Sequence, residues 1–140
     1  MNLIWNKNKK LFASRFPSLA EKYAPLLAQE DVPHPFWEIL PAKDGSVCAA
    51  EQGKKLHSAY NPLREAEQAV LTADKTCTAG VFFAIGLGYT VQAFASRFPD
   101  KTIIIVENDA ARFFAALALT DFSAVFAVKN CVCALECPAE

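Results

Sequence analysis

The stretch "AIGLGYT", residues 84–90, decides how the fold is interpreted. It overlaps the end of the apolar run "AGVFFAIG" (residues 79–86) and the start of "YTVQAFASRF" (residues 89–98), which is amphipathic at helical spacing. An apolar run of strand length without polar alternation is typical of a parallel strand that is buried on both faces. Gly86 and Gly88 therefore lie in a turn from a strand to a helix, where nucleotide-binding sheets place a phosphate loop.

The same order of strand and helix continues toward the C-terminus. "KTIIIVE" (residues 101–107) predicts a second buried strand, and "DAARFFAALAL" (residues 109–119) predicts a second helix. The third strand is either "CVCAL" (residues 131–135) or "AVFAV" (residues 124–128). A β-α-β-α-β order within about 60 residues is typical of half of a doubly wound parallel sheet.

The N-terminal half has a different pattern. Residues 7–29 predict two helices, the second starting at a capping box formed by Ser18 and Glu21. Residues 36–57 predict a small antiparallel β unit with a hairpin turn at Asp44-Gly45.

A further helix is expected to follow that unit. Asn61 is the expected N-cap, with Pro62 in the first turn. Ala66, Ala69 and Val70 are expected to face inward.

These elements predict an α/β fold in two units. Residues 1–74 form an N-terminal helical and β-hairpin unit, and residues 75–140 form a partial Rossmann-like parallel sheet. Half of such a sheet leaves an open edge and an uncovered apolar face, so we expect the chain to self-associate. The candidates for the exposed surface are four phenylalanines: Phe113, Phe114, Phe122 and Phe126.

Composition excludes several classes of function. The 140 residues are 53% hydrophobic with a net charge of -1, which supports a real core and disfavours nucleic acid as a partner. No apolar run approaches the roughly 20 residues that span a bilayer, and the N-terminus lacks the order of a signal peptide. We therefore predict a cytoplasmic protein without membrane association.

The cysteines give only a weak signal for a metal. Their number is odd, and Cys131, Cys133 and Cys137 follow a C-x-C-x3-C spacing with no histidine after them. Cys131, Cys133 and Leu135 would share one face of a strand, so we predict no metal site.

The glycine turn is the candidate binding site. Glycines allow a phosphate to approach the backbone, and the following helix presents N–H groups and the positive end of its dipole. Glu107 lies 21 residues after Gly86, where an acid hydrogen-bonds ribose hydroxyls in nucleotide-binding sheets. The predicted nucleotide-binding residues are Gly86, Leu87, Gly88, Tyr89 and Glu107.

Two positions depart from known fingerprints. Val91 stands where a dinucleotide fingerprint has its third glycine, and Ala84 stands where many S-adenosylmethionine-dependent methyltransferases carry an acid. The alternative interpretation is that the turn is only a close junction between a strand and a helix.

Several strings together resemble one family. "LHSAYNPLREAE" (residues 56–67), "AIGLGYTVQAF", "IIIVEND" and "ALALTDFS" are similar to the motility accessory factor (Maf) family, bacterial flagellin glycosyltransferases that share a domain with archaeal 6-hydroxymethylpterin diphosphokinase-like proteins. The most specific parts are the S-x-Y-x-P-x-x-E-A string (residues 58–66) and the G-L-G-Y turn. The resemblance implies transfer of a nonulosonic, sialic-acid-like sugar from a CMP-sugar to flagellin. It also implies a longer protein with its catalytic part downstream, so this segment alone is expected to be catalytically incomplete.

The S-x-Y-x-P-x-x-E-A string allows two interpretations. In the first, His57, Ser58, Tyr60, Arg64 and Glu65 line a groove. Ser58, Tyr60 and Arg64 could bind substrate there, with Arg64 pairing with a phosphate or with the sugar carboxylate. The alternative is a helix start with Asn61 as its cap. His57 could act as a base but is more often structural, and no catalytic constellation can be assembled, so the catalytic residues stay unknown.

Three classes of function therefore stay open. The first is the N-terminal part of a flagellin glycosyltransferase. The second is a small α/β enzyme related to methyltransferases or pterin diphosphokinases, and the third is a non-catalytic scaffold. The absence of a G-x-x-x-x-G-K-[ST] loop disfavours a P-loop phosphotransferase.

Overall fold

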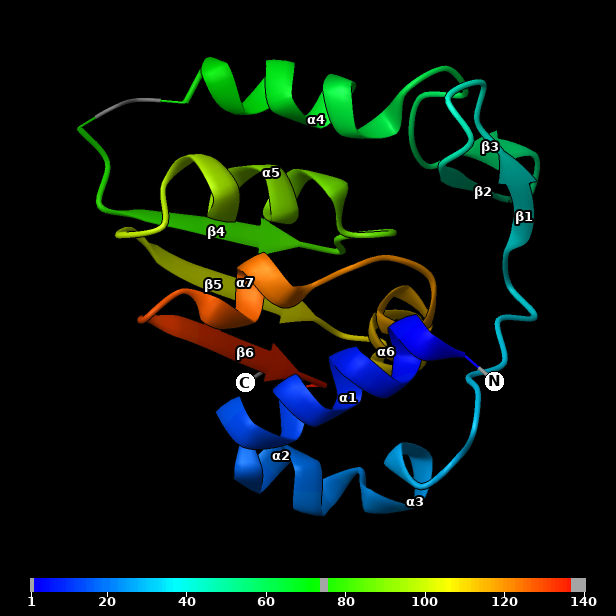
Figure 1. Cartoon of the computed structure of the whole chain (residues 1–140), viewed down its shortest axis with the longest axis vertical. Helices are drawn as coiled ribbons and strands as arrows, with labels where there is room; N and C mark the ends of the chain where they lie inside the picture. Colours follow the sequence, from blue (N-terminus) through cyan, green and yellow to red (C-terminus); the bar gives the residue numbers. More distant parts are fainter. Residues whose placement is uncertain (1, 74–75, 137–140) are drawn as a thin grey trace.

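The computed structural model describes residues 2–73 and 76–136, and Figure 1 shows the arrangement of the elements. In chain order these elements are α1 (Leu3–Arg15), α2 (Pro17–Lys22), α3 (Ala24–Leu27), β1 (Glu38–Pro41), β2 (Val47–Glu51), β3 (Lys54–Lys55), α4 (Pro62–Leu71), β4 (Ala79–Phe83), α5 (Tyr89–Arg97), β5 (Thr102–Glu107), α6 (Ala110–Leu119), α7 (Ser123–Ala127) and β6 (Cys131–Leu135). Among the described residues, no helix is long and apolar enough to cross a membrane.

The predicted α/β fold is confirmed. Strands β4, β5 and β6 form a parallel sheet in that order, and β1, β2 and β3 form a separate antiparallel sheet. The structure also decides between the two candidates for the third parallel strand. Residues 131–135 form β6, whereas residues 124–127 lie in α7.

In the part of the chain that the structure describes, helices cover only one face of the parallel sheet. Both crossovers move in the same direction across the sheet, and right-handed crossovers of that kind place their helices on the same face. Figure 1 shows α5 and α7 drawn over that face. Ile103 and Ile105 point into it and are fully buried.

The opposite face of the sheet is apolar and open. Val81, Ile104 and Val132 are paired across the three strands, and Phe83 lies two residues along from Val81. Val81 is 50% exposed, Phe83 is 70% exposed and Val132 is 51% exposed. The expectation that β4 is buried on both faces was therefore wrong, because β4 is an edge strand with a bare outer face.

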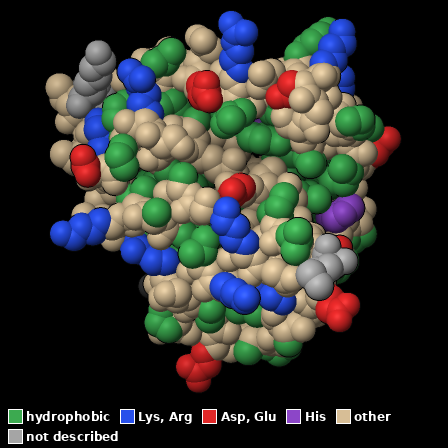
Figure 2. Space-filling model, in the orientation of Figure 1, with side chains coloured by type: hydrophobic (Ala, Val, Ile, Leu, Met, Phe, Trp, Pro, Cys, Tyr) green, Lys and Arg blue, Asp and Glu red, His purple; other side chains and the backbone are tan. Residues whose placement is uncertain are grey.

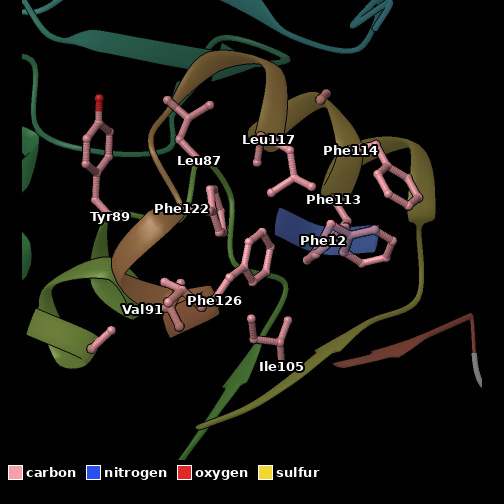
Figure 3. Packing of buried hydrophobic residues seen from close by; sticks show 14 of the residues in the cluster. Phe12, Leu87, Tyr89, Val91, Ile105, Phe113, Phe114, Leu117, Phe122 and Phe126 are labelled. Atoms are coloured by element: carbon pink, nitrogen blue, oxygen red, sulfur yellow. The ribbon is translucent and has the colours of Figure 1, made fainter. Parts of the chain in front are cut away.

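The four phenylalanines expected at the surface are buried. Phe113, Phe114 and Phe122 are 0% exposed and Phe126 is 2% exposed, so the predicted surface was wrong. Figure 3 shows Phe122 and Phe126 beside each other beneath the glycine turn, with Phe12 of α1 close by. Helix α1 packs on α6 and α7 and covers this cluster, which is why these four side chains are buried.

A buried asparagine fastens α1 to the parallel-sheet unit. Asn8 is fully buried, and its Nδ2 donates to the carbonyls of Leu117 (2.8 Å) and Thr120 (2.6 Å). Its Oδ1 accepts from the N–H of Phe122 at 3.1 Å. One apolar core therefore runs from α1 to β6, across the boundary that the sequence predicts at residues 74 and 75.

The antiparallel unit lies at the carboxyl ends of the parallel strands (Figure 1). Its hairpin turns at Asp44-Gly45 as predicted, and Gly45 has φ +89°. Three contacts hold it there: the hydroxyl of Tyr89 donates to Val47 O (2.6 Å), Leu87 N–H donates to His57, and Arg112 binds Glu51. In this chain, the edge of the sheet that commonly binds ligands is thus partly covered by its own N-terminal half.

Several details of the helices differ from the sequence expectations. The N-terminal segment forms three helices, α1 to α3, instead of the two expected over residues 7–29. Ser18 does not start a helix, because Phe16 is the N-cap of α2 and Pro17 is its first residue. In α4, Asn61 caps the helix as predicted, but Ala69 is exposed. The buried residues of α4 are Pro62, Ala66 and Val70, which follow a four-residue spacing.

Candidate functional site

The glycine turn between β4 and α5 has an unusual backbone. Gly86 has φ +60° and Gly88 has φ +90°, and Ala84 also adopts a left-handed conformation with φ +49°. A left-handed conformation is costly for alanine and easy for glycine. At Gly88 there is a second reason for glycine, because a Cβ atom would lie 2.3 Å from Cζ of Phe122.

Both polar backbone atoms of Leu87 are held by side chains. Its N–H donates to Nε2 of His57 at 3.1 Å, and its carbonyl accepts from the hydroxyl of Thr120 at 2.6 Å. Nε2 of Gln92 donates to the same threonine oxygen at 2.9 Å. The turn is therefore fixed from the protein interior by Thr120 and from the outside by His57.

Tyr89 is a structural contact in this conformation. Its side chain is buried, and its hydroxyl points toward the antiparallel unit (Figure 3), where it donates to Val47 O. Burial raises the pKa of Tyr89 to about 12. Its ring meets His57 edge-on, with the ring centroids 5.1 Å apart.

Glu107 is buried at the carboxyl end of β5. Its carboxylate accepts from the N–H of Asp109 at 3.2 Å and from the N–H of Ile85. Burial raises the pKa of Glu107, and this effect exceeds that of the hydrogen bonds, which lower it. The acid predicted to bind ribose thus joins the two turns that follow β4 and β5.

Two neighbouring depressions meet at His57 and Glu65. The first, a cleft of about 420 Å³, runs along β4 and the turn and is lined by Leu56, His57, Glu65, Val81, Phe82, Phe83, Ala84, Ile85, Gly86, Thr90 and Val91. The second, of about 430 Å³, is lined by Lys55, Leu56, His57, Ser58, Ala59, Tyr60 and Glu65. We call the two together the His57 cleft. Burial lowers the pKa of His57, with Glu65 opposing that shift.

The S-x-Y-x-P-x-x-E-A string folds back on itself. Ser58 Oγ accepts from Tyr60 N–H (3.1 Å), and Ser58 N–H donates to the Glu65 carboxylate (3.2 Å). Asn61 Oδ1 accepts from the N–H of Arg64 at 3.0 Å. The helix-start interpretation is therefore confirmed for Asn61, while the side chain of Arg64 lies on the exposed face of α4.

The structure brings some of the predicted binding residues together and separates others. Gly86 lines the His57 cleft near the turn, and Ser58 and Tyr60 line its other part. Leu87, Gly88, Tyr89 and Glu107 are buried and do not line the cleft, and Arg64 does not line it either. The grouping of Ser58, Tyr60 and Gly86 in one place joins the two most specific strings of the sequence.

Several residues of the site escaped the sequence analysis. Thr120 and Gln92 support the turn, and neither was identified from the sequence. Arg112 holds Glu51 through two hydrogen bonds of 3.0 Å each and also contacts Asp109. The paired charges of Glu51 and Arg112 lie 61 residues apart, so no local pattern identifies them.

The cysteines of β6 lie on the covered face of the sheet. Cys131 and Cys133 pair with Ile103 and Ile105, as their predicted sharing of one strand face requires. Burial raises the pKa of Cys131 to about 11. Cys137 lies outside the described residues. Within residues 2–73 and 76–136, no three His, Cys, Asp or Glu side chains are grouped to hold a metal ion.

Two comparisons with known proteins by sequence give a match to this chain. Residues 37–130 match the model of a family described as the glycosyltransferase Maf N-terminal domain. An uncharacterized protein of Treponema pallidum (strain Nichols) is 33% identical over 119 residues, which are 80% of this chain and 40% of that protein.

A solved structure shares the fold. The structure of a MAf glycosyltransferase from Magnetospirillum magneticum AMB-1 matches 99% of this chain with a TM-score of 0.63 and 14% sequence identity. The chain spans 28% of that protein and 40% of the Treponema relative.

Proposed function

Because the chain belongs to the glycosyltransferase Maf N-terminal domain family, we propose that it is the N-terminal part of an enzyme that glycosylates flagellin. The donor in this proposal is a nucleotide-activated nonulosonic sugar, and the reaction takes place in the cytoplasm. The segment contributes binding of the acceptor or of the donor and does not complete catalysis by itself. The proposal rests on the His57 cleft, which unites Ser58 and Tyr60 with Gly86.

The charges of the cleft favour the acceptor as its occupant. The part of the cleft along β4 contains the carboxylate of Glu65, and no Lys or Arg is among the described residues that line it. Lys55 lines the other part of the cleft, so a phosphate group bound along β4 would meet a like charge without a neutralising partner in that part. A flagellin segment with serine or threonine hydroxyls can instead donate hydrogen bonds to Glu65 and pack on Val81 and Phe83.

Donor binding is the second candidate and rests on the start of α5. Thr90 is exposed beside Gly86, in the first turn of a helix whose N-terminus favours negative charge. A phosphate could reach the N–H of Leu87 only by displacing His57 from it. Glu107 could reach a ribose only after releasing the N–H groups of Asp109 and Ile85.

Nuclear magnetic resonance of the isotope-labelled chain tests these roles. We expect purified flagellin to perturb the amide signals of Ser58, Tyr60 and Thr90, and CMP-N-acetylneuraminic acid to leave them nearly unchanged. Glu65→Gln should weaken flagellin binding by about 2- to 10-fold, since it weakens the acceptor of a hydrogen bond. Glu67→Gln is the matched control, because Glu67 lies on the same helix and lines a different groove.

The two candidate roles predict opposite effects of Glu65→Gln on the affinity for the ligand. If the cleft binds the donor, this change removes a like charge and should tighten binding of the CMP-sugar. Perturbation of Gly86 and Thr90 by the CMP-sugar alone would overturn the acceptor role in favour of the donor role. If neither flagellin nor the CMP-sugar perturbs the cleft at millimolar concentration, both roles fail for this segment.

We also propose self-association of the chain, through the open face of the parallel sheet. Val81, Phe83 and Val132 form an apolar surface there, and parallel sheets are commonly covered on both faces. Sedimentation velocity should show a concentration-dependent dimer that Phe83→Ser shifts toward the monomer. Leu3→Ser is the matched control, because Leu3 is 71% exposed and lies on α1. A monomer at high concentration, or equal effects of the two changes, would contradict this assignment.

A further inference from the structure

We propose that the contact between His57 and Leu87 is a pH-sensitive latch, which is closed when the imidazole is neutral and opens when it is protonated. Nε2 of His57 lies 3.1 Å from the N–H of Leu87 and accepts its hydrogen bond. His57 belongs to the segment that follows the antiparallel unit, whereas Leu87 belongs to the glycine turn. The latch therefore joins the two halves of the chain at the cleft.

The chemistry of imidazole makes this contact dependent on protonation. Because Nε2 accepts a hydrogen bond, the proton of the neutral ring is on Nδ1. Protonation adds a hydrogen to Nε2, and the imidazolium then has two donors and no acceptor. Two N–H groups would face each other across 3.1 Å, so protonation breaks the hydrogen bond rather than weakening it.

The groups that face His57 determine where the ring goes. Glu65 of α4 supplies the negative charge, and it lines both parts of the cleft together with His57. Tyr89 of α5 meets the ring edge-on, and Cys48 of β2 donates through its thiol to the carbonyl of His57 at 3.4 Å. Lys55 of β3 also lines the cleft with His57 and carries the same charge as an imidazolium. Of these groups, only Glu65 attracts a protonated ring, so the imidazolium is expected to turn toward Glu65.

Opening of the latch is expected to be local. The bond from Tyr89 to Val47 and the ion pair of Arg112 with Glu51 still hold the antiparallel unit on the sheet. The N–H of Leu87 and the surface of Gly86 then become accessible, while the fold persists. This inference goes beyond the proposed function, because the latch needs no ligand and can be tested without one.

The direction of the stability change follows from the burial of His57. Its pKa in the folded protein lies below the ordinary value of 6.5, so the unfolded chain binds a proton first as the pH falls. The stabilisation is fully present above pH 6.5 and is lost as the pH falls through the folded pKa. Burial raises the pKa of Glu107, so this carboxyl group makes stability increase as the pH falls, which is the opposite trend. A variant of His57 is therefore needed to separate its contribution to the pH dependence of stability.

The test is a pH titration of the isotope-labelled chain between pH 8 and pH 5, followed by nuclear magnetic resonance. His34 and His57 are the two histidines of the chain, so the imidazole signals can be assigned to each. We expect the Leu87 amide signal to move with the midpoint of His57 and with that midpoint alone. Hydrogen exchange of this amide, corrected for the intrinsic pH dependence of exchange, should lose protection through the same transition.

Two variants of His57 distinguish its role as a hydrogen-bond acceptor from its role as a titrating group. His57→Gln places an amide oxygen near the position of Nε2 and does not titrate, so protection of Leu87 should become independent of pH. His57→Phe keeps a ring against Tyr89 but has no acceptor, so Leu87 should be unprotected at every pH. If the wild-type Leu87 amide does not follow the titration of His57, the latch is refuted, and this result needs neither variant to fold.

Discussion

Replacement of Gly88 by alanine is expected to lower the free energy of unfolding by about 2–5 kcal/mol, through two added costs. The residue has φ +90°, a conformation that costs an alanine about 1–2 kcal/mol. The new Cβ atom would also lie 2.3 Å from Cζ of Phe122. Phe122 is fully buried and stacks on Phe126 with the ring centroids 5.7 Å apart, so it has little room to move.

Gly45→Ala is a close control for this experiment. Gly45 has φ +89°, and a Cβ atom there would meet no atom within 4 Å. The difference between the two variants in urea denaturation therefore measures the steric part, about 1–3 kcal/mol. Phe122→Leu should cost less in the Gly88→Ala background than in the wild type, because it removes the clash. Equal losses of stability in Gly88→Ala and Gly45→Ala would show that Phe122 does not constrain the turn.

Asn8→Leu is the second change with a large expected effect. Leucine fills a similar volume but leaves the carbonyls of Leu117 and Thr120 and the N–H of Phe122 without the partners that Asn8 provides. An unsatisfied buried polar group costs about 1–3 kcal/mol, so the free energy of unfolding should fall by about 3 kcal/mol or more. The measurement is urea denaturation followed by the fluorescence of Trp5 and Trp37, with the midpoint and slope fitted separately.

Lys7→Ala removes a surface contact of α1 and serves as a comparison for Asn8→Leu. Lys7 and Asp121 form an ion pair of 3.0 Å between α1 and the loop before α7, and both side chains are about half exposed. Exposed pairs of this kind contribute about 1 kcal/mol or less. If Lys7→Ala proves as costly as Asn8→Leu, the buried hydrogen bonds are not what fastens α1 to the rest of the chain.

Local patterns in the sequence were enough to predict the parallel sheet. The strands after residue 78 are short apolar runs, and Asp44-Gly45 and Asn61-Pro62 are turn and cap signals that act over a few residues. The errors concern which face of an element is covered. Phe113 and Phe122 were expected at the surface because nothing near them in sequence indicates that α1 returns to cover them.

The candidate site was predictable in its position and unpredictable in its contacts. The glycines predict a turn at the carboxyl edge of the sheet, because glycine readily adopts the left-handed backbone conformation that a tight turn needs. The partners of that turn come from distant segments: His57 is 30 residues from Leu87, and Thr120 is 33 residues from it. A histidine in a polar string gives no signal that its ring nitrogen meets a backbone amide of another unit.

The attachment of α1 also has a consequence for protein synthesis. Asn8 has partners that lie 109, 112 and 114 residues later in the chain. At translation rates of about 5–20 residues per second, roughly 6–23 s pass between synthesis of Asn8 and synthesis of Phe122. During that time Trp5 and Phe12, both fully buried in the finished fold, lack the α6 and α7 surfaces that cover them. Helix α1 therefore exposes these apolar side chains to solvent until α6 and α7 have been made.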